Sequence, residues 1–368
     1  MQSFDVVIIG GGVIGCALAR TLAAERVRVA IVERGALGEE ASWAAAGMLA
    51  PSAEAEKQSP LFALGRASLE RYHQFAPELE AETGIACEYR AVGSLVVFAD
   101  EKERQVWCDS LAWQRGQGVP IEELSSSELR EYEPQLAPAA GAFFLPRDHQ
   151  INNRLLMQAL VQSCRRRGVE FILGKPALGI ERNNGRASGV RFENERIHAG
   201  QVVNAAGCWA GSIAVPGIAP APIRPVKGQM LALQSDSLRL RHVARSQHVY
   251  VVPRAGGRFV IGSTMEEAGF DKTSRVGPLT GLLNIAQRIC PELAKSVLTE
   301  HWAGLRPASS DGLPMLGPTS LDGYFVALGH FRNGILLAPI TADILSGWLL
   351  RGKPPISADA FLPSRFEQ

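Results

Sequence analysis

DVVIIGGGVIGCALARTLAAERVRVAIVE, residues 5–33, is the stretch that decides the fold. Its first part, residues 5–10, is a short apolar run rich in β-branched residues, which predicts a buried strand. Residues 13–24 carry apolar side chains at helical spacing, and residues 27–33 form a second apolar run. The stretch therefore predicts a strand–helix–strand unit, the building block of a parallel sheet covered by helices.

Three glycines lie at the turn between the first strand and the helix. Gly10, Gly12 and Gly15 have the spacing G-x-G-x-x-G, and Glu33 ends the second strand. Such glycines let the backbone approach a pyrophosphate at the helix N-terminus, and the acid accepts hydrogen bonds from ribose hydroxyls. An acid at position 33 disfavours a 2′-phosphate, so we expect NAD or FAD and not NADP.

Two further stretches consist largely of small residues: ASWAAAGMLAP, residues 41–51, and VVNAAGCWAG, residues 202–211. Residues 41–51 would show no clear apolar face, either as a helix or as a strand. Small residues allow the backbone to lie against a flat, extended ligand, which favours FAD over NAD. Tight packing of helices is the alternative explanation.

Composition narrows the class of protein. The 368 residues include 46% hydrophobic and 20% charged residues, with a net charge of +1 and interspersed signs. This pattern argues against a nucleic-acid partner. The six cysteines are scattered without a CxxC pair, so we expect reduced thiols, no metal site and a cytoplasmic location. Asp343 interrupts the apolar C-terminal run and the N-terminus lacks signal-peptide features, so no membrane partner is expected.

Periodicity over the rest of the chain predicts alternating helices and strands. Helices are expected at residues 60–83, 100–116, 126–132, 152–167 and 279–289, and as a long buried helix near the C-terminus. Strands are expected at residues 169–173, 177–182, 187–193, 199–207, 225–233, 248–254, 258–264, 297–303, 313–317 and 324–329, with a hairpin turn at 183–185. We predict an α/β fold (α+β overall), in which a Rossmann-type domain (1–84, 145–222 and 303–368) is interlaced with a largely antiparallel domain (85–144 and 223–302).

An arginine near the C-terminus needs a partner. In GHFRNGILLAP, residues 329–339, Arg332 stands at the start of an apolar run that predicts a buried helix. A cation there is costly unless an anion meets it. The residues alone leave open which anion that is.

Seven segments together resemble the FAD-dependent D-amino-acid oxidase family, and within it the glycine oxidases of thiazole biosynthesis. The segments are IIGGGVIG, ASWAAAGMLAP, PVKGQ, VVNAAGCWA, HVYVVPR, GLRPASSDGLPMLG and GHFRNGILLAP, in the family's order over nearly the whole chain. The resemblance implies an FAD-binding Rossmann-type domain interlaced with a substrate domain on an antiparallel sheet, and a homo-oligomer. Residues 304–317 contain no cysteine, so we expect non-covalent FAD.

The resemblance also implies the site residues. Tyr250, Arg306 and Arg332 would be the catalytic residues that bind the substrate carboxylate, which suits the bidentate fork of arginine. His248, Met265 and Met48 would complete the substrate site. Contacts to FAD are expected from Gly10, Gly12, Val13, Ile14, Gly15, Glu33, Arg34, Ser42, Ala45, Ala46, Gly47, Met48, Ala177, Ala205, Ala206, Gly207, Trp209, Arg306, His330, Phe331, Arg332, Asn333, Gly334, Ile335 and Leu336.

The implied reaction is the oxidative deamination of glycine, sarcosine and small D-amino acids. Hydride would leave Cα for flavin N5, and dioxygen would reoxidise the flavin to give hydrogen peroxide. The imine would serve thiazole and thiamine biosynthesis as dehydroglycine, or hydrolyse to glyoxylate and ammonia. A D-amino-acid dehydrogenase that reduces a quinone, a flavin-binding module without turnover and an NAD dehydrogenase are the alternatives. Arg306 could also pair with Asp311 instead of a substrate.

Overall fold

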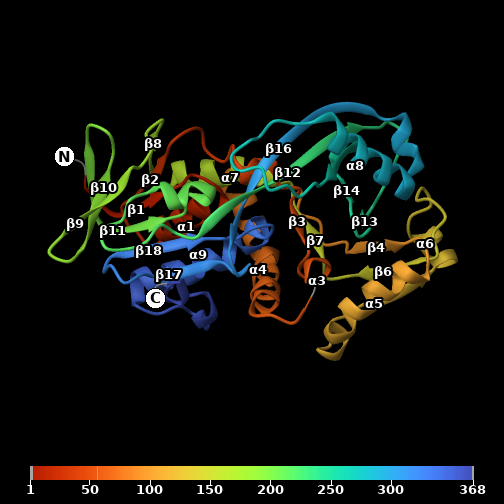
Figure 1. Ribbon diagram of the computed structural model, residues 1–368, viewed down its shortest axis with the longest axis horizontal. Coiled ribbons are helices and arrows are strands. Elements are labelled where there is room, and N and C mark those ends of the chain that lie inside the picture. The colour runs from red at the N-terminus through yellow and green to blue at the C-terminus, as the bar shows by residue number, and fades with distance from the viewer. Residues whose placement is uncertain (1–2, 56, 367–368) are drawn as a thin grey trace.

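The computed structural model describes residues 3–55 and 57–366, which build two eight-stranded sheets (Figure 1). In the first sheet the strand order is β17-β18-β11-β1-β2-β8, and the hairpin β9–β10 is added to β11. Its strands are β1 (Ser3–Ile9), β2 (Val29–Glu33), β8 (Glu170–Leu173), β9 (Gly179–Asn183), β10 (Arg186–Arg191), β11 (Arg196–Asn204), β17 (Met315–Pro318) and β18 (Tyr324–Leu328). β1 pairs in parallel with β2 and β11, so the predicted strand–helix–strand unit is confirmed.

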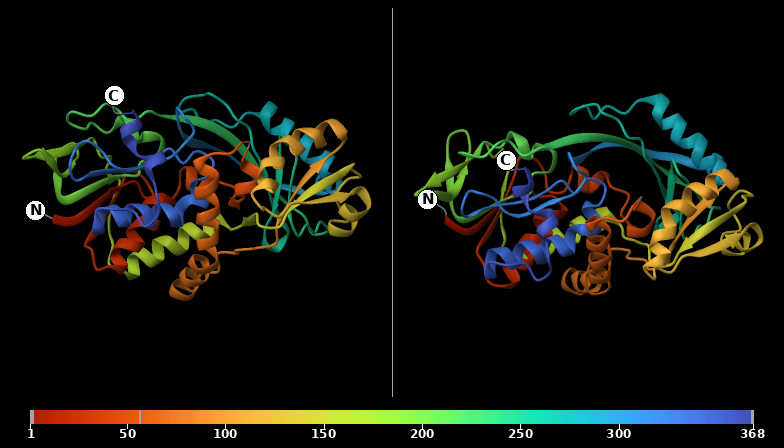
Figure 2. Two further views of the ribbon diagram at one scale, coloured as in Figure 1. Left: turned by 90° about the horizontal axis from the view of Figure 1, so that it is seen from below. Right: turned by 60° about the horizontal axis from the view of Figure 1, so that its bottom comes forward.

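Four long helices pack together beside the first sheet (Figure 2). They are α1 (Val13–Ala24), α4 (Pro60–Thr83), α7 (Asn153–Arg166) and α9 (Gly334–Arg351). The side chain of Asn152 caps α7 by accepting hydrogen bonds from Arg154 N and Leu155 N. The predicted bounds of α1 and α4 agree with the structure because both helices have clear apolar spacing and clear ends.

α9 contains a proline, yet it is continuous. Pro339 has no N–H, so the carbonyl of Ile335 has no helical partner. The hydroxyl of Tyr72 in α4 donates a hydrogen bond to this carbonyl, and Ser68 Oγ donates to the next one, Leu336 O, at 2.6 Å. α4 thereby fixes the first turns of α9.

α9 is also, within residues 3–55 and 57–366, the one helix whose length and apolar character would allow it to span a membrane. In the structure 67% of it is buried inside the protein. Its one acidic residue, Asp343, forms an ion pair with Arg71 of α4. α9 is thus packed as the core helix that the apolar run predicted.

The second sheet is antiparallel except for one pair of neighbours, in the order β16-β12-β15-β14-β13-β4-β6-β5. Its strands are β4 (Ser94–Phe98), β5 (Glu122–Ser125), β6 (Gly141–Leu145), β12 (Ile223–Gln234), β13 (Val243–Arg245), β14 (Tyr250–Pro253), β15 (Arg258–Gly262) and β16 (Val297–Ser309). α5 (Glu101–Gly116), α6 (Ser126–Tyr132) and α8 (Val276–Ile289) lie beside it. The long strands β12 and β16 reach from this sheet toward the first (Figure 1).

Three predictions about this half of the chain need correction. No strand was predicted within residues 85–144, where the structure has β4, β5 and most of β6. It also missed β13 and began the following strand at His248, two residues before β14. β16 continues to Ser309, across the predicted domain boundary at residue 302. The division into two domains itself remains a prediction.

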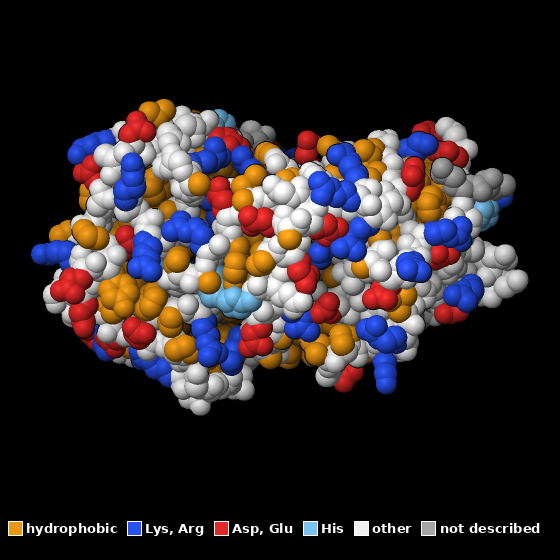
Figure 3. Space-filling model, turned by 180° about the vertical axis from the view of Figure 1, so that it is seen from behind, with side chains coloured by type: hydrophobic (Ala, Val, Ile, Leu, Met, Phe, Trp, Pro, Cys, Tyr) orange, Lys and Arg blue, Asp and Glu red, His pale blue; other side chains and the backbone are white. Residues whose placement is uncertain are grey.

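Short elements connect the two sheets around the small-residue stretch. α2 (Ala41–Ala44), β3 (Met48–Leu49) and α3 (Pro51–Glu54) follow one another, and β3 pairs with β7 (His149–Gln150). Acidic and basic side chains are interspersed over the face shown in Figure 3, in agreement with the mixed charge pattern of the sequence.

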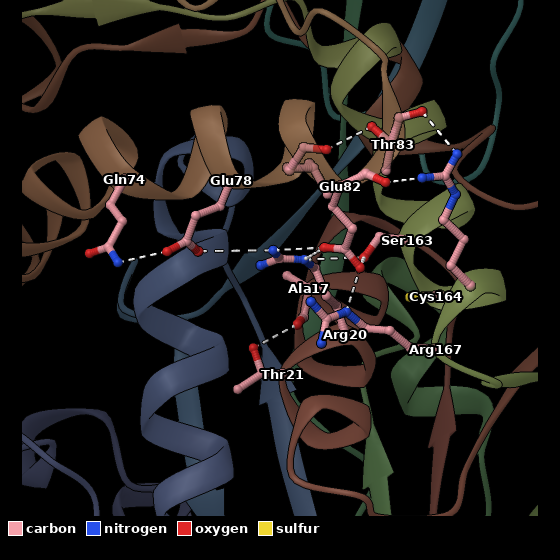
Figure 4. Close-up of polar contacts among 12 residues, drawn as sticks. Ala17, Arg20, Thr21, Gln74, Glu78, Glu82, Thr83, Ser163, Cys164 and Arg167 are labelled. Carbon is pink, nitrogen blue, oxygen red and sulfur yellow. Dashed lines mark hydrogen bonds and ion pairs between the residues drawn. The ribbon is translucent and has the colours of Figure 1, made fainter.

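An ion-pair cluster joins three of the helices beside the first sheet (Figure 4). Glu82 of α4 accepts hydrogen bonds from Arg20 Nη2 at 3.0 Å, Ser163 Oγ at 2.8 Å and Arg167 Nε at 2.6 Å. Burial raises the pKa of Glu82, but these three hydrogen bonds outweigh it and lower the pKa to about 2. The cluster thus favours ionised Glu82 in the folded protein.

Replacing Glu82 with glutamine is expected to lower the free energy of unfolding by about 1–3 kcal/mol at pH 7, because two arginines lose their charged partner. The folded-state pKa of Glu82 is depressed to about 2, below the usual 4.5. The stabilisation is therefore present above pH 4.5 and is lost as the pH falls toward 2. Chemical unfolding at pH 7 and at pH 3 measures both effects.

Glu78→Gln is the matched control. Glu78 lies one turn earlier in α4, is 51% exposed and comes no closer than 4.0 Å to Arg20. Its replacement should change stability by less than about 0.5 kcal/mol. Equal losses for both variants would mean that the cluster contributes no specific stabilisation.

Candidate active site

A cavity of about 460 Å³ lies where the carboxyl ends of the parallel strands face the second sheet. Loops that follow β1, β2, β11 and β18 line it on one side, through residues such as Gly12, Glu33, Ala205 and His330. Tyr250 of β14 and neighbouring residues of the second sheet line the other side. Parallel α/β sheets typically bind ligands at this edge.

The glycine turn forms one wall of the cavity. Gly10 has φ +111°, and a Cβ there would lie 2.4 Å from the carbonyl oxygen of Ala205, so only glycine fits. Gly12 precedes α1 in an extended conformation. Its Cβ would lie 3.1 Å from Ser42 Oγ, which accepts a hydrogen bond from Val13 N at 2.9 Å. The N-terminus of α1 therefore lies at the wall of the cavity, with Ser42 Oγ bound to its first N–H.

Glu33 is held in place beside this turn. Its Oε2 accepts a hydrogen bond from Gly11 N at 2.8 Å, and its Oε1 accepts one from Gly35 N at 2.9 Å. Each oxygen keeps a lone pair for a further donor. The neighbouring Arg34 lies 3.5 Å from the centre of the Trp209 ring, and the two residues border the same end of the cavity.

The small-residue stretches line the cavity and also pack tightly. In residues 41–51, Gly47 has φ +68° and its Cβ would lie 2.0 Å from Ile151 O. A Cβ at Gly304 of β16 would lie 2.3 Å from the Cβ of Ala44. Close packing therefore accounts for some of the small residues in 41–51. Others in this stretch, such as Ala45, Ala46 and Met48, line the cavity.

All but two of the predicted cofactor and substrate residues line this cavity. The two exceptions are Gly15 and Leu336. A Cβ at Gly15 would lie 2.0 Å from Gly10 O, so this glycine packs α1 against the turn. Leu336 is buried and faces Gly65 of α4. Contacts from these two residues to FAD remain predictions.

Tyr250 belongs to a row of residues across the second sheet. It pairs with Gly262 of β15, which pairs with Met230 of β12. The missing side chain of Gly262 makes room for the tyrosine, because a Cβ there would lie 2.6 Å from the hydroxyl. Burial raises the pKa of Tyr250, and the nearby charge of Arg306 only partly offsets this. The hydroxyl therefore remains a hydrogen-bond donor at neutral pH.

Arg306 of β16 lies beside Tyr250. Its Nη2 donates to Ser263 Oγ at 2.5 Å and its Nη1 to Thr264 O at 3.2 Å, while Gly228 leaves room for the guanidinium. Burial lowers the pKa of Arg306, and contact with Tyr250 opposes the shift. Asp311, considered as its partner from the sequence, pairs instead with Arg365 at 2.7 Å.

Arg332 meets an anion of the protein itself. Its Nε lies 3.1 Å from Oε2 of Glu54, and Oε1 of Glu54 accepts a hydrogen bond from Arg245 Nη1 at 2.8 Å. Sequence reasoning found neither Glu54 nor Arg245, although both line the cavity. Glu54 ends the four-residue α3 and Arg245 ends the unpredicted β13, so neither stood in a recognised element.

The remaining predicted residues differ in exposure. His330 is buried, its Nε2 lies 3.0 Å from Thr341 Oγ1, and burial lowers its pKa to about 3, so its ring is neutral at physiological pH. Met265 is 64% exposed and His248 is also exposed, which places both at the mouth of the cavity.

Residues 5–348 match the family model of FAD dependent oxidoreductases. The chain is 34% identical over 358 residues to a glycine oxidase of Pseudomonas aeruginosa, covering 96% of this chain and 97% of the relative. It is 35% identical over 370 residues to the bifunctional protein ThiO/ThiG of Synechocystis sp., covering 98% of this chain but only 54%, about half the length, of that relative. The crystal structure of glycine oxidase from Geobacillus kaustophilus has a TM-score of 0.94 and 33% identity, covering 98% of both chains.

Proposed function

Because the chain belongs to the family of FAD dependent oxidoreductases, we propose that it is an oxidase that deaminates glycine and other small amino acids. Sarcosine and small D-amino acids are further substrates under this proposal. The observation that carries it is the position of Arg306 and Tyr250, a carboxylate-binding pair on the wall of a cavity suited to a dinucleotide. The glycine oxidases among the relatives support the choice of glycine.

The residues around the glycine turn fit FAD. Gly12, Val13 and Ile14 line the cavity at the N-terminus of α1, where a pyrophosphate binds well. Glu33 has lone pairs for ribose hydroxyls, and Ala45, Ala46 and Ala205 offer backbone to a flat ring system. When bound, FAD supplies the hydride acceptor and passes electrons on to dioxygen.

The protein's own task is then to hold and orient the substrate. Two guanidinium N–H groups of Arg306 can bind both carboxylate oxygens, and the Tyr250 hydroxyl can donate to one of them. Fixing the carboxylate fixes the direction of the Cα–H bond, which is the main contribution to rate that such a site can make. Arg332 adds positive charge nearby, and no acid–base residue is required of the chain.

Anaerobic mixing with glycine tests the proposal. We expect the yellow flavin absorbance to bleach, and admission of air to restore it with formation of hydrogen peroxide. Methylamine, which lacks the carboxylate, is the matched control and should not bleach the flavin. Bleaching without recovery in air would indicate a dehydrogenase with another acceptor. An absence of bleaching would mean that Arg306 serves a different substrate.

Three finer points are also proposals. The imine product would be used for thiazole formation, which the name of the bifunctional ThiO/ThiG relative supports. We propose a cytoplasmic location, in keeping with six cysteines that are all free thiols in the structure. Homo-oligomerisation is proposed from the resemblance to glycine oxidases, and sedimentation of the holoenzyme measures it.

A further inference from the structure

The inner end of the cavity carries more positive charge than one substrate carboxylate needs. Its charged lining residues are Arg245, Arg306, Arg332 and Glu54, with a net charge of +2. The other charged lining residues, Glu33, Arg34 and Glu40, lie around the glycine turn. Excess cationic charge in a partly buried site calls for anions, because it is costly to remove from water alone.

Glu54 offsets only part of this charge. Burial raises its pKa, but the charges of Arg245, Arg332 and Arg306 outweigh burial and lower the pKa below the usual value. Glu54 is therefore ionised, and its two oxygens are each engaged by one arginine. Asp148 lies behind α3, accepts hydrogen bonds from Ser52 N and Ala53 N, and does not line the cavity.

Arg245 is the arginine that the proposed reaction leaves without a task. It pairs with Tyr250 across β13 and β14, so the two side chains lie on the same face of the sheet. Its side chain is 12% exposed and lines the cavity, and its Nη1 donates to Glu54 while its Nη2 has no hydrogen-bond partner among the described residues. An unused donor of a buried guanidinium beside the substrate site can bind an anion strongly.

We infer that the site accepts amino acids that carry a second anionic group, such as a second carboxylate, and that Arg245 binds this group. The inference rests on the proposed function and narrows its substrate class. Arg306 and Tyr250 bind the carboxylate next to the reacting carbon, and Arg245 binds the second one from the neighbouring strand. Glu54 keeps the charge of the site from rising further and thereby limits how strongly anions bind.

Binding of malonate and of its monoamide, malonamate, tests this directly. The two compounds have nearly the same shape but differ by one negative charge. Perturbation of the flavin spectrum of the holoenzyme gives a Kd for each without turnover. We expect malonate to bind about tenfold or more tightly than malonamate in the unmodified protein. Equal affinities would overturn the inference.

A series of charge variants gives a sharper test, because Arg245→Gln lowers the net charge of the site to about +1 and Glu54→Gln raises it to about +3. The preference for malonate should therefore increase in the order Arg245→Gln, unmodified protein, Glu54→Gln. A purely structural role of the Arg245–Glu54 pair predicts no such order, since both variants break the same pair. An unchanged preference in Arg245→Gln would overturn the inference.

Arg258→Gln is the matched control. Arg258 belongs to the same sheet and pairs with Glu300 at 2.5 Å, but it does not line the cavity. Its replacement should leave the ratio of the two Kd values as it is in the unmodified protein. If Arg258→Gln reduced the preference for malonate as much as Arg245→Gln does, the preference would reflect the overall charge of the sheet. That result would contradict the assignment of the second anion to Arg245.

Measurements of turnover test the second anion site and the proposed function, on which it rests, separately. D-Aspartate and D-asparagine form a second pair that differs by one charge, and anaerobic bleaching can be followed for both and for glycine. If glycine bleaches the flavin but malonate binds no more tightly than malonamate, the proposed function stands and the second anion site is wrong. If malonate binds more tightly than malonamate but no amino acid bleaches the flavin, the second anion site stands and the proposed function is wrong.

Discussion

Lysine in place of Arg306 is expected to lower kcat/KM for glycine by about 2–4 kcal/mol, roughly 30- to 1,000-fold, while the flavin stays bound. The guanidinium is held from behind by Ser263 and Thr264, which leaves other N–H groups free in the cavity. Lysine keeps the charge but has no planar fork, so it cannot hold both carboxylate oxygens in one orientation. Steady-state kinetics with peroxide detection measure the change.

Two observations would contradict this role of Arg306. Unchanged kinetics would mean that another residue binds the carboxylate, and loss of flavin would mean that Arg306 mainly supports the cofactor site. Arg258→Lys is the matched control, because Arg258 pairs with Glu300 in the same sheet away from the cavity. We expect that control to alter kcat/KM by less than about threefold.

The elements nearest the glycine turn could be predicted from sequence because their signals are local. The apolar run of β1, the spacing in α1 and Glu33 at the end of β2 lie within 33 residues. G-x-G-x-x-G in that setting has a direct physical meaning, since each glycine satisfies a steric demand. The close backbone approaches at Gly10 and Gly15 agree with that interpretation.

Strands β4 and β6 of the second sheet were harder to predict because they are short and buried on both faces. SLVVF in β4 and GAFFL in β6 lack the alternation that marks a half-exposed strand, and no Asn-Gly or Asp-Gly turn follows or precedes either of them directly. The turn between β13 and β14 also lacks such a signal. Arg245 was missed for this reason, since only the hairpin brings it opposite Tyr250.

The partner of Arg332 shows where a single sequence stops being informative. The need for an anion could be inferred from the apolar run that follows this arginine, but its identity depends on tertiary structure. Glu54 is far from both arginines in the chain, and 191 positions separate it from Arg245. A substrate carboxylate was the anion expected for Arg332, and the structure adds a protein carboxylate that this arginine already contacts.

Valine in place of Gly12 is expected to abolish retention of FAD. Gly12 has φ −78° and ψ −175°, a conformation that valine adopts readily, so the backbone gains no strain. The added side chain would instead crowd Ser42, whose Oγ lies 3.1 Å from the new Cβ, at the cavity wall where the cofactor pyrophosphate is expected. We expect the purified variant to be colourless, with FAD affinity lowered by roughly 100-fold or more.

The effect on the cofactor must be separated from an effect on folding. Gly277→Val is the matched control, because Gly277 is exposed in α8 and a Cβ there meets no atom within 4 Å. Circular dichroism of Gly12→Val should match that of the unmodified protein after removal of its FAD, since the substitution leaves the turn intact. A variant that is purified yellow, with one FAD per chain, would exclude the turn before α1 as the pyrophosphate site.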